Sequence, residues 1–261
     1  MWTADSRNNL PGNHDWSQKC SIQEMESCPV MLPDCMSEEQ WSIYQRVIAD
    51  CRAAGLPFAV GGGLAIGVYT GRWRNTKDID LYVLRKDVER AKEILNRAGL
   101  VDYYDQLPYD RAWIYRSVLN KTIVDVIFSM ANHKSDVDET WIMGGPEITI
   151  AGETFRVVPP EEMIWAKLYV LQKDRCDWPD VFNMIYAQHE QLDWGHLVDR
   201  LGADAPLLRS VLTVFGWLCP ALTRKLPRWL WEETEKPAAE SLPPRADLLD
   251  RREWFSPAAE C

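Results

Sequence analysis

The sequence predicts an α/β (α+β) fold in which a mixed β-sheet is flanked by helices and is followed by a C-terminal helical region. Three observations support this fold class. Short apolar strand patterns alternate with amphipathic helix patterns as far as about residue 98. Two predicted hairpins then follow, at 111–129 and at 147–158. From Pro159 onward, the apolar residues recur at helical spacing.

The first regular element is predicted to be a helix that follows Ser37. The run Ser37-Glu-Glu-Gln40 has the form of a capping box, in which a serine hydroxyl and a glutamine side chain bind free amides of the first turn. Gly55 ends the pattern. The apolar face of this helix is expected to pack on the sheet, and it consists of Trp41, Tyr44, Val47, Ile48 and Cys51.

A strand, a glycine turn and a helix are predicted between residues 58 and 69. The apolar run 58–60 precedes Gly61, Gly62 and Gly63, and a helix-compatible segment follows at 64–69. Glycine lets a ligand approach the main chain, and the amides at a helix N-terminus favour anions such as phosphate. The three glycines alone are equally compatible with a simple tight turn. Combined with the acidic strand that follows, they predict a phosphate-binding site.

Two aspartates, Asp78 and Asp80, lie in the next predicted strand. Residues i and i+2 of a strand share a face, so both carboxylates point one way while Ile79 and Leu81 point into the core. Two carboxylates this close raise each other's pKa unless a cation compensates, and Mg²⁺ prefers oxygen ligands. A polar strand edge is the alternative interpretation. The combination with the glycine turn favours a metal site.

A third aspartate, Asp125, lies in the second strand of the hairpin predicted at 111–118 and 121–129. Aspartate is depleted in strands and costly to bury without a partner, yet its neighbours are Val124 and Val126. Its charge could be balanced by Lys121 or Arg116 across the turn at Asn120. It could also be balanced by a metal ion shared with Asp78 and Asp80, which is the interpretation we favour.

The remaining elements are predicted in order. An amphipathic helix at 87–98 ends at Gly99, and a hairpin pairs 147–150 with 154–158 around Gly152. A helix is expected at 160–172, and a further one follows Asp177-Trp-Pro-Asp180. Asp177 and Asp180 have the pattern of an N-cap and an acidic first-turn residue, so we expect them to cap that helix rather than take part in catalysis.

Lys167 lies among apolar residues of the helix predicted at 160–172. Its neighbours three and four positions away are Met163, Ile164, Val170 and Leu171. Two interpretations are open at this point. The side chain could extend along the apolar surface to place its ammonium in water, or it could reach a bound triphosphate.

Composition narrows the classes of function. The 261 residues are 46% hydrophobic and 26% charged, as in soluble globular proteins. No run approaches the roughly 20 apolar residues that cross a bilayer, and the first residues lack the apolar core of a signal peptide. A cytoplasmic protein is therefore expected. The seven scattered cysteines form no Cys-x-x-Cys pair, which argues against zinc and disulfide frameworks.

Four residues carry a family resemblance. Arg74, Thr76, Asp78 and Asp80 follow the pattern Arg-x-Ser/Thr-x-Asp-x-Asp, downstream of a glycine turn. This arrangement resembles the polymerase-β-like nucleotidyltransferase superfamily, especially its AbiEii-type (abortive-infection) and aminoglycoside nucleotidyltransferase branches. The resemblance implies a nucleotidyltransferase fold with a third carboxylate on a later strand, which Asp125 supplies.

The resemblance extends more weakly into the helical region. Members of the superfamily carry Pro-Glu followed by a lysine that contacts the nucleotide phosphates, and then an arginine and an aspartate. Lys167 after Pro160 matches the lysine, and Arg175 matches the arginine. Asp177 or Asp180 matches the aspartate. The resemblance therefore tilts the interpretation of Lys167 toward a nucleotide-binding role.

The expected function is metal-dependent transfer of a nucleoside monophosphate from an NTP, with ATP the expected nucleotide, to a hydroxyl acceptor. Mg²⁺ or Mn²⁺ is the expected cofactor. The net charge of −10 disfavours a nucleic acid and favours a small, cationic, aminoglycoside-like acceptor. The alternatives are an enzyme that acts on tRNA or protein and a non-catalytic, antitoxin-like nucleotide-binding protein. The predicted catalytic and metal-binding residues are Asp78, Asp80 and Asp125, and the predicted nucleotide-binding residues are Gly61, Gly62, Gly63, Arg74, Thr76 and Lys167.

The predicted organisation has four parts. An irregular N-terminal arm is expected at 1–36 and a loosely ordered tail at 237–261, because both are rich in proline and lack periodicity. The catalytic domain is expected at 37–158. A helical region at 159–236 is expected to complete the cleft.

Overall fold

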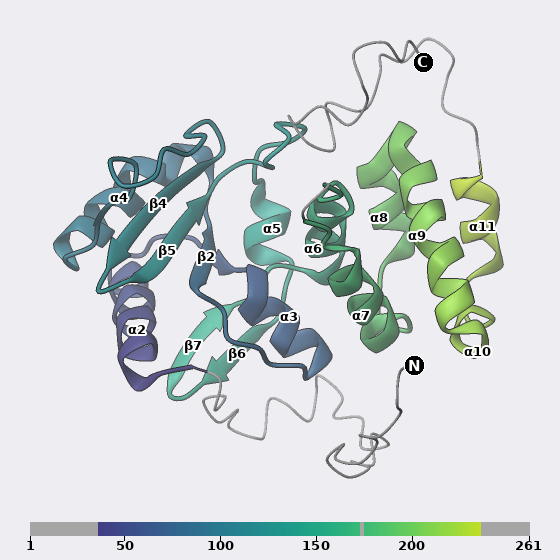
Figure 1. Ribbon diagram of the computed structural model, residues 1–261, viewed down its shortest axis with the longest axis horizontal. Helices are drawn as coiled ribbons and strands as arrows, with labels where there is room; N and C mark the ends of the chain where they lie inside the picture. Colours follow the sequence, from purple (N-terminus) through teal and green to yellow (C-terminus); the bar gives the residue numbers. More distant parts are fainter. Residues whose placement is uncertain (1–35, 173–174, 236–261) are drawn as a thin grey trace, which may run out of the picture.

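The computed structural model describes residues 36–172 and 175–235 (Figure 1). The predicted tail at 237–261 and the predicted arm, apart from Met36, lie outside these residues. The sheet and its helices occupy one half of the described chain, and the helices that follow residue 159 occupy the other (Figure 1). This arrangement confirms the predicted fold class.

A mixed sheet of five strands forms the centre of the first half. The strand order is β1-β2-β5-β4-β3, in which β2 and β5 are parallel and the other neighbours are antiparallel. A separate two-stranded sheet pairs β6 with β7. The strands are β1 (Ala59–Val60), β2 (Asp78–Tyr82), β3 (Val101–Asp102), β4 (Ile114–Leu119), β5 (Thr122–Ile127), β6 (Glu147–Ile150) and β7 (Glu153–Arg156).

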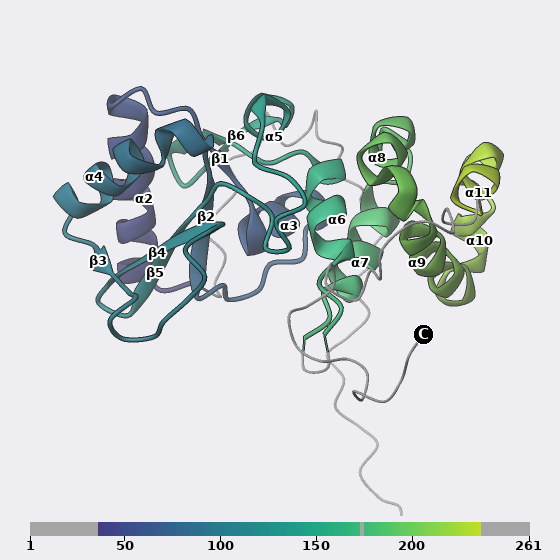
Figure 2. The same ribbon diagram turned by 90° about the horizontal axis from the view of Figure 1, so that it is seen from above.

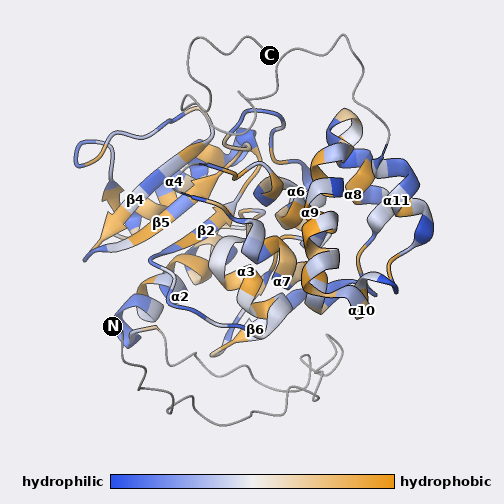
Figure 3. Ribbon diagram, turned by 45° about the vertical axis from the view of Figure 1, so that its right-hand side comes forward, coloured by the Kyte–Doolittle hydropathy of each residue, from blue (hydrophilic) through white to orange (hydrophobic). Residues whose placement is uncertain are grey.

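The two faces of the central sheet differ in character. Ile79, Leu81, Val124 and Val126 are all buried, and α2 packs against β5 on that face. Orange, hydrophobic stretches mark the strands of this sheet in Figure 3. The alternate residues of the same strands include the predicted aspartates, so period-two alternation separates the core from the candidate site.

Helices α2 (Glu38–Ala53), α3 (Gly62–Thr70) and α4 (Val88–Arg97) belong to the sheet half. Ser37 caps α2 as predicted, because its hydroxyl accepts a hydrogen bond from the Gln40 amide. The other half of the predicted capping box is wrong. The Gln40 side chain donates instead to Tyr44 Oη and to the Thr76 carbonyl oxygen, so this residue ties α2 to the loop before β2.

The hairpin turns have the backbone that their sequences allow. Asn120 and Lys121 join β4 to β5 with φ of 48° and 68°, and Ala151 and Gly152 join β6 to β7 with φ of 45° and 88°. Two consecutive positive φ angles are typical of the type I′ turn, whose twist matches that of the flanking strands. The turn at Asn120 and Lys121 sets the register in which β4 faces β5.

The helices of the second half follow one another away from the sheet (Figures 1 and 2). α3 packs against α7, and α6 packs against α7 and α8, which joins the two halves. α6 ends at Leu168 rather than at 172, because residues 171 and 176 form an isolated β-bridge. No helix among the described residues is long and apolar enough to span a membrane. The remaining helices are α5 (Glu139–Met143), α6 (Pro160–Leu168), α7 (Trp178–Gln188), α8 (Trp194–Leu201), α9 (Ala205–Leu218), α10 (Pro220–Thr223) and α11 (Arg228–Thr234).

Candidate active site

The three predicted carboxylates converge on one small volume. Asp80 of β2 lies opposite Asp125 of β5 in the parallel register, and Asp78 lies two residues before Asp80 on the same face. One carboxylate oxygen from each of the three residues lies within 4.8 Å of the others. The side chain of Asp78 is 36% exposed and that of Asp125 is 2% exposed, so the group runs from the pocket mouth to its floor.

Arg116 is a fourth member of this group. It faces Asp125 directly in the antiparallel register of β4 and β5. Its Nε lies 2.8 Å from Asp125 Oδ1, and its Nη2 lies 2.5 Å from Asp125 Oδ2 and 3.9 Å from Asp78 Oδ2. Of the two alternatives that the sequence offered for Asp125, the arginine partner is therefore present, and the carboxylates that would share an ion lie beside it. The other candidate partner, Lys121, lies in the hairpin turn and is exposed.

The electrostatics of the group favour a bound cation. Burial, together with the neighbouring Asp78 and Asp125, raises the pKa of Asp80 to about 8, although Lys167 and Arg116 act in the opposite direction. Burial also raises the pKa of Asp125, against the lowering effect of Arg116. Two basic residues are therefore not enough to stabilise all the carboxylates in their charged form. An additional positive charge would allow them to ionise together.

The glycine turn leaves room for one of these carboxylates. A Cβ built on Gly62 would lie 1.6 Å from Asp80 Oδ2, and the residue has a φ of +57°. Both observations require glycine at this position. Gly62 and Gly63 line the pocket and are the first residues of α3, where helix amides have no intrahelical partner.

Gly61 has a different role from its neighbours in the turn. Its amide donates to the carbonyl oxygen of Asp80, 2.9 Å away. A Cβ at Gly61 would also collide with the Tyr82 ring. This glycine therefore holds the turn against β2, and the predicted contact between its amide and a phosphate is not supported by its position.

Thr76 holds the first aspartate. Its Oγ1 lies 2.6 Å from the carbonyl oxygen of Asp78 and 3.1 Å from Asp78 Oδ1, and it donates to this residue. The threonine itself is buried, and its carbonyl oxygen accepts the hydrogen bond from Gln40. This contact orients Asp78.

A second cluster of charges faces the carboxylates across the pocket. Lys167 Nζ lies 2.5 Å from Asp177 Oδ2 and 3.0 Å from Asp180 Oδ2. Its side chain is only 12% exposed, so the interpretation that the ammonium reaches into water is wrong. Two arginines complete the cluster. Arg74 binds Asp180 through two hydrogen bonds of 2.9 Å, and Arg175 binds Asp177 at 3.0 and 3.1 Å.

The capping interpretation of Asp177 and Asp180 is confirmed in position but not in bonding. Asp177 occupies the N-cap position of α7 and Asp180 lies in its first turn, but the Asp177 side chain makes no capping hydrogen bond. Burial acts to raise its pKa, and Arg175 and Lys167 together outweigh burial and hold the pKa below its ordinary value. The two aspartates therefore position Lys167, Arg74 and Arg175 at the pocket.

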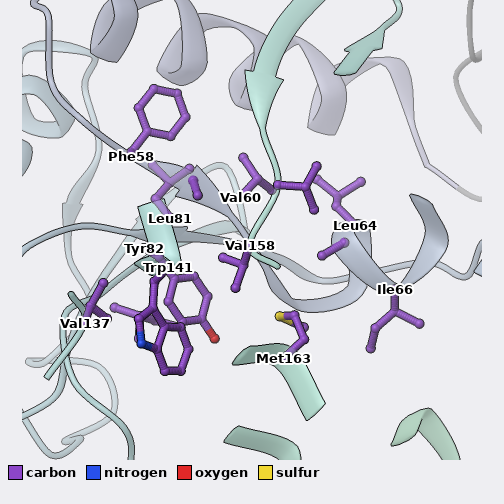
Figure 4. Packing of buried hydrophobic residues seen from close by; sticks show 14 of the residues in the cluster. Phe58, Val60, Leu64, Ile66, Leu81, Tyr82, Val137, Trp141, Val158 and Met163 are labelled. Carbon is purple, nitrogen blue, oxygen red and sulfur yellow. The ribbon is translucent and has the colours of Figure 1, made fainter. Parts of the chain in front are cut away.

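Except for Asp180, the residues of these two clusters line a pocket of about 670 Å³ between the sheet and the α6–α7 segment. Its apolar wall includes Tyr82 and Trp141, whose rings stack with centroids 5.4 Å apart, and Met163 lies beside them (Figure 4). Sequence reasoning did not single out Trp141, because it lies in the short helix α5, for which no periodic signal exists. The acidic and basic residues of the lining are equal in number: Asp78, Asp80, Asp110, Asp125 and Asp177, and Arg74, Lys77, Arg116, Lys167 and Arg175.

The residues present fit a divalent metal ion. The donor set consists of carboxylate oxygens within 4.8 Å of one another, which suits a hard cation such as Mg²⁺ or Mn²⁺. Burial and the neighbouring Asp78 and Asp125 raise the pKa of Asp80, so a bound cation would favour its charged form. Asp78 and Asp80, on one strand edge beneath the glycine turn, are the residues that would hold the ion.

The raised pKa of Asp80 predicts a pH-dependent stability. In the folded chain Asp80 keeps its proton up to about pH 8, whereas in the unfolded chain it loses the proton near its ordinary value of 3.8. The folded state then binds more protons, so its stability falls as pH rises between these values. In EDTA, we expect Asp80→Asn to match the wild type near pH 4 and to exceed it near pH 8 by on the order of a few kcal/mol.

Thermal unfolding of both proteins across this pH range tests the expectation. Adding Mg²⁺ near pH 8 should raise the melting temperature of the wild type and leave that of Asp80→Asn nearly unchanged, since an ion that binds only the folded state stabilises it. The same pH dependence in both proteins would show that Asp80 is not the titrating group.

Several solved structures resemble the chain. The antibiotic-resistance factor ANT(2'')-Ia is 21% identical, with 73% of this chain and 98% of that chain covered and a TM-score of 0.46. The lincosamide antibiotic adenylyltransferase LnuA, with lincomycin bound, is 14% identical over 58% and 98% of the two chains, with a TM-score of 0.42. JHP933 from Helicobacter pylori is 16% identical over 76% and 88%, with a TM-score of 0.39. A comparison with curated proteins gives no match.

One protein family matches most of the chain. The match covers residues 38–220, which contain both charge clusters of the pocket, and the family is described as "uncharacterised nucleotidyltransferase". A match of this extent includes the whole sheet and the helices up to α9. The chain therefore belongs to this family and is a nucleotidyltransferase.

Proposed function

We propose that the chain transfers a nucleoside monophosphate from an NTP to the hydroxyl group of a small acceptor, with Mg²⁺ or Mn²⁺ as its cofactor. The observation that carries this proposal is the juxtaposition of Asp78, Asp80 and Asp125 beneath the N-terminus of α3. An acidic group that needs a cation lies beside free helix amides that favour phosphate. ATP is the proposed nucleotide.

Both walls of the pocket contribute groups that bind the triphosphate. Gly62 and Gly63 offer their amides to phosphate oxygens, and Lys167 and Arg74 offer positive charge from the opposite wall. Asp177 and Asp180 hold these cations before a ligand arrives, so little reorganisation is needed on binding. A divalent ion bound by Asp78 and Asp80 supplies further positive charge on the triphosphate.

Transfer is an in-line displacement at the α-phosphorus. A new bond forms between the acceptor oxygen and the α-phosphorus, and the bond to the bridging oxygen of the pyrophosphate breaks. Pyrophosphate leaves with the electron pair. Asp125 accepts the hydroxyl proton, for which burial of its carboxylate is favourable, because burial raises its pKa. Thr76 keeps Asp78 in place during this step.

The acceptor is proposed to be small and cationic. The pocket volume of about 670 Å³ suits a small molecule together with part of a nucleotide. Because the charged residues of the lining balance, the preference for a cation rests on the net charge of −10, whose long-range potential attracts positive ligands. Transfer to tRNA or to protein is the alternative within the same chemistry.

The proposal is tested by incubating the purified chain with α-labelled ATP, GTP, CTP or UTP and Mg²⁺ or Mn²⁺. Separate acceptor pools contain aminoglycosides, tRNA and protein. We expect label on the aminoglycoside pool, with ATP as donor and no label in EDTA. Label on tRNA or protein would identify the alternative acceptor. Nucleotide binding without label on any pool would favour a non-catalytic binding protein.

Arg74 is expected to contribute directly to nucleotide affinity. Its side chain is 57% exposed and lines the pocket, while Asp180 binds its guanidinium group. Arg74→Ala should weaken NTP binding about ten- to a hundredfold, because a hydrogen bond to a charged group is worth roughly 1.5–3 kcal/mol. Equilibrium binding of a labelled NTP measures the effect.

Arg85→Ala is the matched control for this variant. Arg85 also forms a two-point pair with an aspartate, Asp136, and its side chain is 50% exposed, but it does not line the pocket. Both substitutions remove one arginine from an aspartate pair. Asp136 is then left exposed to water, and the buried Asp180 keeps Lys167 as a partner. Equal NTP affinity in the two variants would contradict the proposed role of Arg74.

A further inference from the structure

We propose that Arg116 takes the place of a second metal ion at this site. Resting on the proposed function, this inference concerns how many ions the nucleotide-free chain binds. It states that one divalent ion binds between Asp78 and Asp80, and that Asp125 lies outside its ligand set because Arg116 neutralises it.

The sheet register makes the arginine a fixed part of the site. Asp80, Asp125 and Arg116 lie side by side on three neighbouring strands, since β2 pairs with β5 at Asp80 and Asp125, and β5 pairs with β4 at Asp125 and Arg116. Residues in register on adjacent strands share a face. The arginine is therefore directed at the carboxylates by the backbone and not by a flexible loop.

Further local contacts keep Arg116 in position. Its amide donates to Tyr109 Oη at 3.0 Å, and Tyr109 Oη donates in turn to Asp102 Oδ1, also at 3.0 Å. The arginine side chain is 27% exposed, whereas Asp125 is 2% exposed. A pair this deeply placed is costly to break, because the partner left behind would be a buried, uncompensated charge.

The geometry of the pair leaves Asp125 poorly suited to bind a cation. Arg116 engages both carboxylate oxygens, Oδ1 through Nε and Oδ2 through Nη2. Such a two-point pair is the strongest arrangement between these groups. A metal ion at Asp125 would also lie close to the guanidinium, which carries a full positive charge. Asp78 Oδ2 lies farther from Nη2, at 3.9 Å, so this oxygen remains available to an ion.

Counting bound Mn²⁺ tests the inference. The full chain is titrated with Mn²⁺ in the absence of nucleotide, and free Mn²⁺ is followed by electron paramagnetic resonance. We expect one ion per chain for the wild type. Arg116→Met should bind two, because Asp125 then has no partner and becomes a ligand. Arg116→Lys, which keeps the charge, should bind one.

A double variant keeps the test decisive if Arg116→Met fails to fold. Arg116→Met with Asp125→Asn removes both charges of the pair, which is far less costly than removing one. It should bind one Mn²⁺ with an affinity within a few-fold of the wild type, since no ligand is lost. A loss of more than about tenfold would mean that Asp125 is a ligand and would overturn the inference.

The remaining outcomes separate the inference from the proposed function. Two Mn²⁺ ions bound to the wild type would overturn the role of Arg116 and leave the metal-dependent transfer intact. One ion bound to folded Arg116→Met would likewise overturn it. Absence of Mn²⁺ binding by the wild type would overturn the metal site itself, and with it both proposals.

Discussion

Asp78→Asn and Asp80→Asn are each expected to abolish nucleotidyl transfer while leaving the fold intact. Each substitution keeps the size of the side chain and removes one of the charges that would hold the metal ion. Loss of a preorganised electrostatic contact at the reacting group costs at least about 10²- to 10³-fold in rate. The rate of label transfer measures this loss, and circular dichroism with thermal unfolding checks the fold.

Asp136→Asn provides a matched control for these variants. Asp136 is paired with Arg85, its side chain is 52% exposed, and it does not line the pocket. Its loss should leave transfer unchanged and should lower stability by less than about 1 kcal/mol. If both Asp78→Asn and Asp80→Asn kept a rate within tenfold of the wild type, the assignment of the site would be wrong.

The position of the two strand aspartates could be predicted from sequence, because it depends only on the alternation of side chains along a strand. The buried Ile79 and Leu81 confirm that Asp78 and Asp80 point away from the core. That Asp125 lies close to Asp80 could only be proposed from the sequence. Its distance from Asp80 depends on the parallel register between β2 and β5, which no local pattern encodes.

The partner of Asp125 could not be decided from the residue pattern alone. The sequence named an arginine across the hairpin and a shared ion as alternatives, and favoured the ion. The type I′ turn at Asn120 and Lys121 places Arg116 directly opposite Asp125, and the parallel pairing places Asp80 on its other side. Each prediction captured one neighbour of Asp125, and only the assembled sheet supplies both.

The ion pairs of the second charge cluster were missed for a different reason. Asp177 and Asp180 have the local pattern of a helix N-terminus, and local patterns dominate an interpretation made from sequence. Lys167 lies ten residues before Asp177, and Arg74 lies 106 residues before Asp180. Three basic residues without assigned partners were the available signal, because buried acids are usually paired.

Gly62→Ala is expected to lower activity nearly as much as the loss of Asp80 itself. The new methyl group would lie 1.6 Å from Asp80 Oδ2 and 2.8 Å from Asp80 Cγ, so the carboxylate must leave its position. The substitution also forces alanine into a left-handed conformation, with φ of +57°, at a cost of about 1–2 kcal/mol. We expect lower stability, weaker Mn²⁺ binding and a transfer rate reduced by on the order of 10²-fold or more.

Gly71→Ala separates the two causes. Gly71 ends the same helix α3 with φ of +67°, and a Cβ there would meet no atom within 4 Å. It therefore carries the same backbone penalty without the collision with Asp80. Its melting temperature should fall, while transfer and Mn²⁺ binding stay at the wild-type level. Rates measured well below both melting temperatures decide the matter. Equal label transfer by the two alanine variants would contradict this expectation. Glycine would then be needed at position 62 only for its positive φ, and its closeness to Asp80 would not affect the transfer reaction.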